Sequence, residues 1–304
     1  MKKSDNSGYV YSLVLADGQQ WNIKSNENSR ELASSWAKAM GLQPYELKEG
    51  TNLIVVLDDC DKSKNIQEMC SVDKDLMLKL PRKGWKSRQV KYIRIWYNDA
   101  VKDVVCKLQN KATFNGNIMG MWYTLHPIYH RAQDSGGLPL HGALLEWKGN
   151  GIVLSAPSKT GKSTCCRRLP LHWRALCDDE TLIVSDKQKQ YMAHPIPSWS
   201  EYIVDVSKRT WNVQHHVPLK AFFFLEQAEK DEAIPIGHGQ AAILINQSAI
   251  AIYRKSLENL VPEEKMVLKK KIFDNACELS KAIPSFVLRF SLAGQFWDEM
   301  EKVL

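Results

Sequence analysis

The first third of the chain shows a period of two between apolar and polar residues, which is typical of strands, interrupted by one helical stretch. Residues 9–23 predict two strands joined by a turn at Asp17-Gly18. Apolar residues then recur at helical spacing from Leu32 to Met40, and Asn28 or Ser29 can cap this predicted helix. Further strands are expected over residues 52–57, 90–97 and 103–108, and loops around a short element over residues 60–88.

From residue 116 onward, short apolar runs alternate with helical stretches. Residues 117–133 predict an apolar helix with a kink at Pro127. The strand expected at 220–225 precedes a charged turn, and the pattern predicts that it forms a hairpin with 233–236. Strands are also predicted at 142–147, 152–155, 181–185, 191–197 and 286–290, and helices at 162–169, 239–259 and 263–282.

Length and composition fit two globular domains. The chain has 304 residues, and domains usually run to about 100 to 200 residues. The apolar share of 44% and the charged share of 25% are ordinary for a globular protein. The pattern divides the chain into a small α+β domain over residues 1–115, which carries no catalytic signature, and an α/β domain over residues 116–304.

The charge and the cysteines exclude several classes of protein. A net charge of +7 without a zinc finger, an RNP motif or an unbroken basic run does not predict nucleic-acid binding, and attraction to ATP or an acidic peptide explains it equally well. No signal-peptide core and no apolar stretch near the roughly 20 residues that span a bilayer is evident, so we expect a cytoplasmic protein without membrane contact. Seven cysteines with no Cys-x-x-Cys pair argue against disulfides and structural zinc.

A strand, a small-residue loop and a helical stretch follow one another at residues 151–164, Gly-Ile-Val-Leu-Ser-Ala-Pro-Ser-Lys-Thr-Gly-Lys-Ser-Thr. This order is typical of a P-loop, or Walker A motif, in which backbone N–H groups surround phosphates. The motif predicts that Lys162 reaches the β- and γ-phosphates of ATP and that the hydroxyl of Ser163 binds Mg²⁺. Ala156 stands where the consensus has its first glycine. The remaining predicted nucleotide-binding residues are Ser158, Lys159, Thr160, Gly161 and Thr164.

Asp178 and Asp179 lie sixteen and seventeen positions after Lys162. Neighbouring residues of an extended chain point to opposite faces, so one carboxylate is expected to bind Mg²⁺ while the other faces the acceptor. An Asp-Asp-Glu run is otherwise typical of a solvated turn, and the nearby P-loop motif favours the functional interpretation.

The order of Leu140-His141-Gly142-Ala143, the P-loop and Cys177-Asp178-Asp179-Glu180 resembles the HPr kinase/phosphorylase family. The chain is most similar to HPr-kinase-related proteins of modified-peptide gene clusters, including lasso-peptide kinases and the ScmC group, from Gly136 to Ser200. The resemblance implies an HPr-kinase and PEP-carboxykinase-like mixed sheet with C-terminal helices. It does not extend to residues 1–115.

The resemblance also implies roles for individual residues. Asp178 is expected to be the general base on the acceptor hydroxyl, and Asp179 a carboxylate on the Mg²⁺ side. His141 is expected to orient the acidic group or the phosphate. Glu201 lies where the resembled family has a further acidic residue near the metal. Members of that family form oligomers, which implies a homo-oligomer here.

The leading functional hypothesis is a Mg-ATP-dependent kinase. It would transfer the γ-phosphoryl group to a Ser or Thr hydroxyl of a small peptide or protein, and the resemblance suggests a ribosomally made precursor peptide as the acceptor. The N-terminal domain would recruit this substrate. Two alternatives are a small-molecule kinase that acts on a free amino acid and a nucleotide-gated binding protein without transfer.

Overall fold

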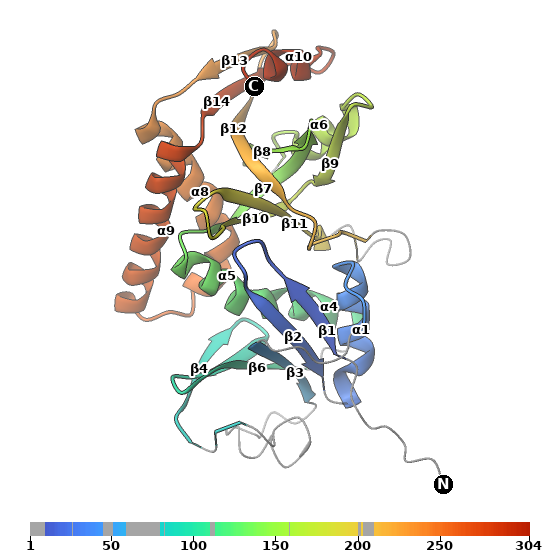
Figure 1. Ribbon diagram of the computed structural model, residues 1–304, viewed down its shortest axis with the longest axis vertical. Helices are drawn as coiled ribbons and strands as arrows, with labels where there is room; N and C mark the ends of the chain where they lie inside the picture. The colour runs from blue at the N-terminus through green and yellow to red at the C-terminus, as the bar shows by residue number, and fades with distance from the viewer. Residues whose placement is uncertain are drawn as a thin grey trace. The chain divides into compact units, whose positions relative to one another are not determined.

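A computed structural model describes residues 10–25, 27–44, 51–58, 80–81, 83–109, 113–157, 159–199, 202 and 210–304. The chain divides into two compact units (Figure 1). The first comprises residues 1–14, 19–127 and 199–210, and the second comprises 15–18, 128–198 and 211–304. The sequence placed a single boundary at 115/116, whereas the chain enters each unit more than once.

In the first unit, the described strands form a six-stranded sheet in the order β1-β2-β3-β6-β5-β4. The pairs β2–β3 and β3–β6 are parallel, and the remaining pairs are antiparallel. Trp21 and Ile23 of β2 and Leu53 and Val55 of β3 are buried on one face, as the period of two requires. Asn22 and Ile54, which point to the other face, are buried as well. The elements are β1 (Tyr11–Val14), β2 (Gln20–Ser25), η1 (Glu27–Ser29), α1 (Arg30–Ala39), β3 (Thr51–Asp58), β4 (Trp85–Val90), β5 (Ile93–Asn98), β6 (Val101–Gln109), α4 (Phe114–Trp122) and η2 (Tyr123–Leu125).

Three local predictions for this unit need correction. Ser29 is the N-cap residue of α1, but its side chain makes no cap bond, because its Oγ donates to the carbonyl of Val55 instead, at 2.9 Å. The strand predicted at 90–97 is interrupted after Val90 by a two-residue turn in which Lys91 has φ 47°. The turn contains no glycine or asparagine, and the apolar–polar alternation continues through it, so the sequence pattern did not predict it. Residues 85–88, predicted as loop, belong to β4; residues 60–79 lie outside the described part of the chain.

The predicted helix over 117–133 is three successive segments, α4, η2 and α5 (His126–Asp134). Pro127 is the second residue of α5 and closely follows the 3-10 segment η2, so the predicted helix changes its geometry next to the proline.

The second unit contains an eight-stranded sheet among its described residues, in the order β11-β10-β7-β8-β12-β14-β13, with β9 paired to β7. The strand β12 is parallel to both β8 and β14, and the other pairs are antiparallel. Helix α8 packs on β7 and lies beside α9 (Figure 1). The elements are α5, β7 (Leu138–Trp147), β8 (Asn150–Ser155), α6 (Lys162–Arg168), β9 (Trp173–Cys177), β10 (Glu180–Ser185), β11 (Tyr191–Ile196), β12 (Val217–Gln227), β13 (Glu232–Pro235), α8 (His238–Leu257), α9 (Pro262–Ala282), β14 (Ser285–Phe290) and α10 (Phe296–Glu301).

The predicted hairpin between 220–225 and 233–236 is wrong. Strand β14 lies between β12 and β13, and β13 pairs with β14 from Glu232 to Pro235. The run Phe222–Leu225 is buried, so β12 needs a neighbouring strand on each side, and the return through α8 and α9 supplies β14 in parallel. The local sequence pattern around β12 and β13 cannot predict that β14, which lies far along the chain, pairs between them.

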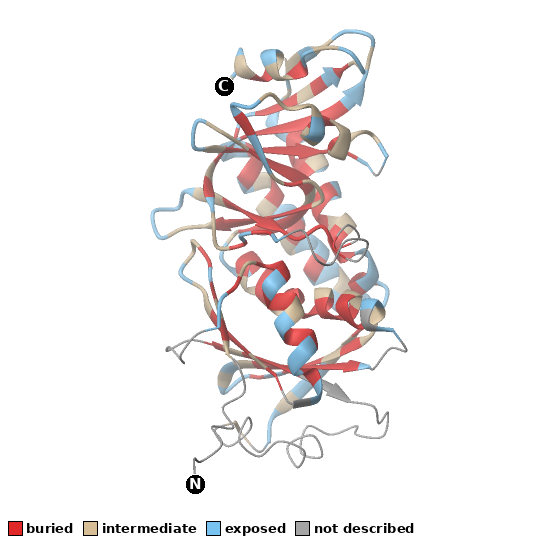
Figure 2. Ribbon diagram, turned by 90° about the vertical axis from the view of Figure 1, so that its right-hand side faces the viewer, coloured by how far each residue is buried: buried red, intermediate tan, exposed pale blue. Residues whose placement is uncertain are grey.

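The structure thus confirms a mixed α/β protein with two mixed sheets and several helices. Figure 2 shows that most residues of the strands of the second unit are buried. An apolar cluster joins Leu154 of β8 and Cys165 of α6 to Phe223, Leu288 and Phe296. This cluster anchors the ends of β8, β12 and β14. Within the described residues, no helix has the length and apolar character needed to cross a membrane.

Candidate functional site

The site begins where β8 leaves the sheet. The apolar strand ends at Ser155, and residues 156–161, here called the 156–161 loop, lead into α6. Gly161 has φ 121°, and a Cβ there would lie 3.0 Å from Cζ of Phe290, so both the backbone conformation and the close packing require glycine. The side chain of Gln227 donates to the carbonyl of Thr160 at 3.0 Å and fixes the loop to β12. Ser158 lies outside the described residues.

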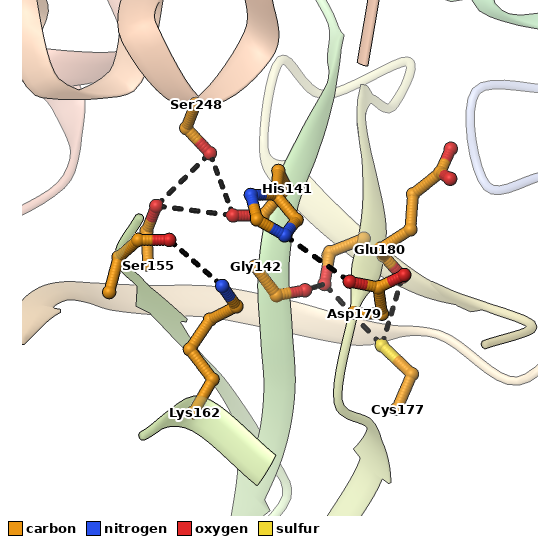
Figure 3. A network of polar contacts seen from close by, with 10 residues as sticks. His141, Gly142, Ser155, Lys162, Cys177, Asp179, Glu180 and Ser248 are labelled. Atoms are coloured by element: carbon orange, nitrogen blue, oxygen red, sulfur yellow. Dashed lines mark hydrogen bonds and ion pairs between the residues drawn. The ribbon is translucent and has the colours of Figure 1, made fainter. Parts of the chain in front are cut away.

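Lys162 is the first residue of α6 and is 7% exposed. Its Nζ donates to the carbonyl of Ala156 at 2.8 Å, which holds the ammonium group against the loop (Figure 3). Burial lowers the pKa of Lys162, and the negative charges of Asp179 and Asp178 oppose that change. A buried cation is therefore held close to two carboxylates.

Asp179, in the bend before β10, pairs with His141 of β7. The pair lies at 3.2 Å between His141 Nε2 and Asp179 Oδ1 (Figure 3). The hydrogen bond from His141 lowers the pKa of Asp179, burial opposes this, and the charges of His141 and Lys162 lower it further. The position of His141 beside the β8 strand, which the sequence predicted, is confirmed by the antiparallel pairing of β7 with β8.

Asp178 lines the same site and has one buried carboxylate oxygen. Its Oδ1 is enclosed and has no hydrogen-bond partner among the described residues. The sequence predicted that Asp178 and Asp179 point to opposite faces of a strand, but both residues lie in the bend between β9 and β10 and both line one pocket. The alternation rule applies to extended chain and fails in a bend. A buried carboxylate oxygen without a donor is suited to accept a proton or to bind a cation.

The pocket has a volume of about 280 Å³. It joins residues from β7, the 156–161 loop, α6 and the bend before β10. Glu201, the further acidic residue suggested from sequence, lies outside the described part of the chain. The lining residues are His141, Lys159, Gly161, Lys162, Ser163, Thr164, Asp178 and Asp179.

Two serines behind the pocket could not be predicted from sequence. Oγ of Ser155 and Oγ of Ser248 donate to the carbonyl of His141 at 3.3 and 3.1 Å, and the two hydroxyls are 3.1 Å apart (Figure 3). Pairing of β7 with β8 begins only at Gly142, opposite Ser155, so the hydroxyls bind the carbonyl at the point where the strands separate. Ser248 lies within α8, and nothing in its sequence context indicates this contact.

The donor set of the pocket fits a magnesium ion. Mg²⁺ prefers oxygen ligands and commonly binds one or two carboxylates together with phosphates and water. Its lining residues include Ser163 with a hydroxyl and Asp178 and Asp179 with carboxylates. In the described part of the chain, no group of three or more His, Cys, Asp or Glu residues could hold a metal by itself.

Together, the fold and the site define a two-unit mixed α/β protein with a polar pocket at the end of a parallel strand. The family model described as SynChlorMet cassette protein ScmC matches residues 104–304. The chain therefore belongs to the ScmC family, which confirms the group that its motifs resemble. The match begins within β6 and includes the entire pocket. The family description names a cassette protein and states no reaction. No curated protein matches the chain.

Proposed function

We propose that this ScmC-family protein is a Mg-ATP-dependent kinase that phosphorylates a hydroxyl group of a small peptide or protein. The observation that carries the proposal is the meeting of Lys162 and Ser163 with Asp178 and Asp179 in one pocket. A phosphoryl-transfer site needs a cation for the phosphates, oxygen ligands for a metal and a base for the acceptor. The residues in this pocket can supply all three.

Each side chain has a distinct role in the proposed reaction. The ammonium group of Lys162 would bind phosphate oxygens of ATP. Asp178 would accept the proton of the acceptor hydroxyl while the new bond from oxygen to the γ-phosphorus forms. The bond from the γ-phosphorus to the β–γ bridging oxygen breaks, and ADP leaves with that oxygen. His141 would keep Asp179 in place through the contact at 3.2 Å.

Magnesium would be held by Ser163 and Asp179, and when bound it supplies positive charge that neutralises the phosphate oxygens. The lowered pKa of Asp179 supports this assignment, because a metal ligand must stay ionised. Asp178, whose Oδ1 has no partner among the described residues, is left for the acceptor.

The family relationship supports a peptide acceptor. A protein of a gene cassette is expected to act on a product of that cassette, and the resemblance to kinases of modified-peptide clusters favours a precursor peptide. The proposed acceptor is therefore a Ser or Thr hydroxyl of such a peptide.

The proposal is tested by incubating the protein and Mg-ATP with a candidate precursor peptide from the neighbouring genes and measuring the mass of the peptide. We expect the gain of one phosphoryl group with wild type. Asp178→Asn should bind ATP normally but transfer at least about a hundredfold more slowly, because a general base has been removed. Asp274→Asn, which changes an exposed aspartate on α9, is the matched control and should behave as wild type.

Other outcomes would redirect the assignment. Equal transfer by Asp178→Asn and wild type would refute the role of Asp178. Phosphorylation of free serine but not of the peptide would favour a small-molecule kinase. ATP binding without transfer to either acceptor would contradict the kinase proposal and favour a nucleotide-gated binding protein.

A further inference from the structure

Directly after the two pocket aspartates, the chain places a third acid in the interior. Glu180 is the first residue of β10 and is 2% exposed. Tyr129, from helix α5, is 1% exposed and donates its hydroxyl hydrogen to Oε1 of Glu180. The sequence suggested a solvated acidic turn as one interpretation of this run, and the burial of Glu180 excludes that interpretation for this residue.

The position of Glu180 connects it to both residues of the contact between His141 and Asp179. It follows Asp179 in the chain, and in the antiparallel pairing of β10 with β7 it lies opposite His141. Sγ of Cys177 donates to the carbonyl of Glu180 at 3.0 Å, which closes the bend that contains Asp178 and Asp179 (Figure 3). Any movement of Glu180 would therefore be transmitted to the bend.

A contribution to folding stability does not readily explain why an acidic residue is buried at position 180. A buried carboxyl group loses its hydration, and a hydrogen bond recovers only part of that cost, so apolar residues of similar volume often serve stability as well or better. The hydrogen bond from Tyr129 does fix the orientation of the Glu180 carboxyl group relative to α5. The charge of Glu180 also reaches Tyr253 of α8: burial raises the pKa of Tyr253, and the charges of Glu180 and Asp134 raise it further.

We infer that Glu180 is a positioning residue for the pocket: held by the hydroxyl of Tyr129, it fixes the bend that carries Asp178 and Asp179 and thereby the contact of Asp179 with His141. Glu180 does not line the pocket and is not assigned a contact with substrate. The inference rests on the proposed kinase function for its kinetic test, but the geometry that it describes can be tested without activity.

The kinetic test compares Tyr129→Phe, Glu180→Ala and Glu180→Gln. Loss of the hydrogen bond should lower kcat about tenfold in the first two variants while KM for ATP stays unchanged, because misplacement of reacting groups impairs transfer more than binding. Glu180→Gln should keep most of kcat, since its amide oxygen can still accept from Tyr129. The matched control is Tyr202→Phe, which removes a different tyrosine hydroxyl, bonded to the carbonyl of Ser35 at 3.1 Å.

Unchanged kcat in folded Tyr129→Phe would overturn the inference. So would equal losses in Glu180→Gln and Glu180→Ala, because the effect would then not depend on the hydrogen bond. If Glu180→Ala does not fold, Tyr129→Phe decides the question, since it removes one oxygen atom and keeps the ring.

A second measurement separates this inference from the proposed function. The imidazole nitrogen signals of His141, observed with ¹⁵N-labelled histidine and assigned with His141→Gln, report the contact with Asp179. They should shift in Tyr129→Phe and remain as in wild type in Glu180→Gln and Tyr202→Phe. If wild type phosphorylates nothing but these shifts occur, the kinase proposal fails and the positioning role stands. If the His141 signals do not move in Tyr129→Phe, the positioning role fails.

Discussion

His141 and Asp179 approach to 3.2 Å between Nε2 and Oδ1, although one lies on β7 and the other in the bend before β10. The sheet brings them together because β10 pairs with the half of β7 that precedes its pairing with β8. The imidazole thus stands between the acidic bend and the strand that feeds the 156–161 loop. This arrangement makes the pKa of Asp179 depend on the hydrogen bond from His141.

Replacement of His141 by phenylalanine, whose ring cannot donate a hydrogen bond to Asp179, should change the pH dependence of the proposed transfer. The hydrogen bond from His141 is the largest cause of the lowered pKa of Asp179, so its loss should raise that pKa. An acid with a lowered pKa stays ionised to lower pH, and the variant should therefore lose activity at a higher pH on the acid side. The measurement is kcat/KM against pH. An unchanged acid limb would show that ionised Asp179 is not required.

Lys162→Met should weaken nucleotide binding. The variant keeps the length of the side chain and removes the buried charge, and charge-assisted bonds to phosphates contribute about 1.5 to 3 kcal/mol each, so we expect a roughly tenfold to hundredfold rise in the Kd for ATP. Isothermal titration calorimetry measures this. The control is Lys220→Met, which changes an exposed lysine on β12, and equal Kd values for the two variants would contradict the role of Lys162.

His194 should make the stability of the protein depend on pH. Its ring is fully buried, Nε2 accepts from the N–H of Ala16 at 3.1 Å, and Nδ1 then donates to the carbonyl of Val213 at 2.8 Å. The pKa of His194 is lowered from 6.5 to about 4, and burial is the largest cause. The hydrogen bond to Val213 raises this pKa, and the charges of His216 and His215 lower it.

The sign of this pH effect follows from the proton balance. Between pH about 6.5 and about 4 the unfolded chain binds a proton at His194 that the folded chain does not, so folding stability falls as pH falls. The loss approaches about 3 kcal/mol at pH 4. In His194→Gln this contribution is absent, and the gap in the free energy of unfolding between wild type and variant should shrink from pH 7 to pH 4 in urea titrations. A constant gap would refute the assignment.

Trp199 should be essential to the first unit. It is 3% exposed and stacks on Trp36, with ring centroids 6.4 Å apart and an interplanar angle of 10°. Trp199→Ala should cost about 3 to 5 kcal/mol of unfolding free energy through the cavity it leaves. Tyr97→Ala, at an exposed position of the same unit, is the control and should cost far less. A loss under 1 kcal/mol for Trp199→Ala would contradict its place in the core.

The position of Trp199 also changes how the proposed recruiting role of residues 1–115 can be examined. Deletion of these residues would remove Trp36 and leave Trp199 without its stacking partner. Such a truncated chain would test folding as well as substrate binding. Substitutions at exposed residues of the first unit are the cleaner way to test recruitment.

The sequence by itself determined the local features of this protein. Alternation and helical spacing predicted most strands and the helices α1, α6, α8 and α9, because these periods arise within a few residues. The order strand, loop and helix at residues 151–164, together with Asp178 and Asp179, named the residues that line the pocket except His141, whose role came from the family resemblance. Its motifs also indicated the ScmC group, which the family match confirms.

Only the tertiary structure decided which distant elements meet. The insertion of β14 beside β12, the hydroxyl of Ser248 on the carbonyl of His141, and the burial of Glu180 under Tyr129 all join residues far apart in the chain. Such contacts depend on which strands and polar groups other elements bury when the chain folds. No local pattern encodes that coverage, because burial is a property of the whole packed unit.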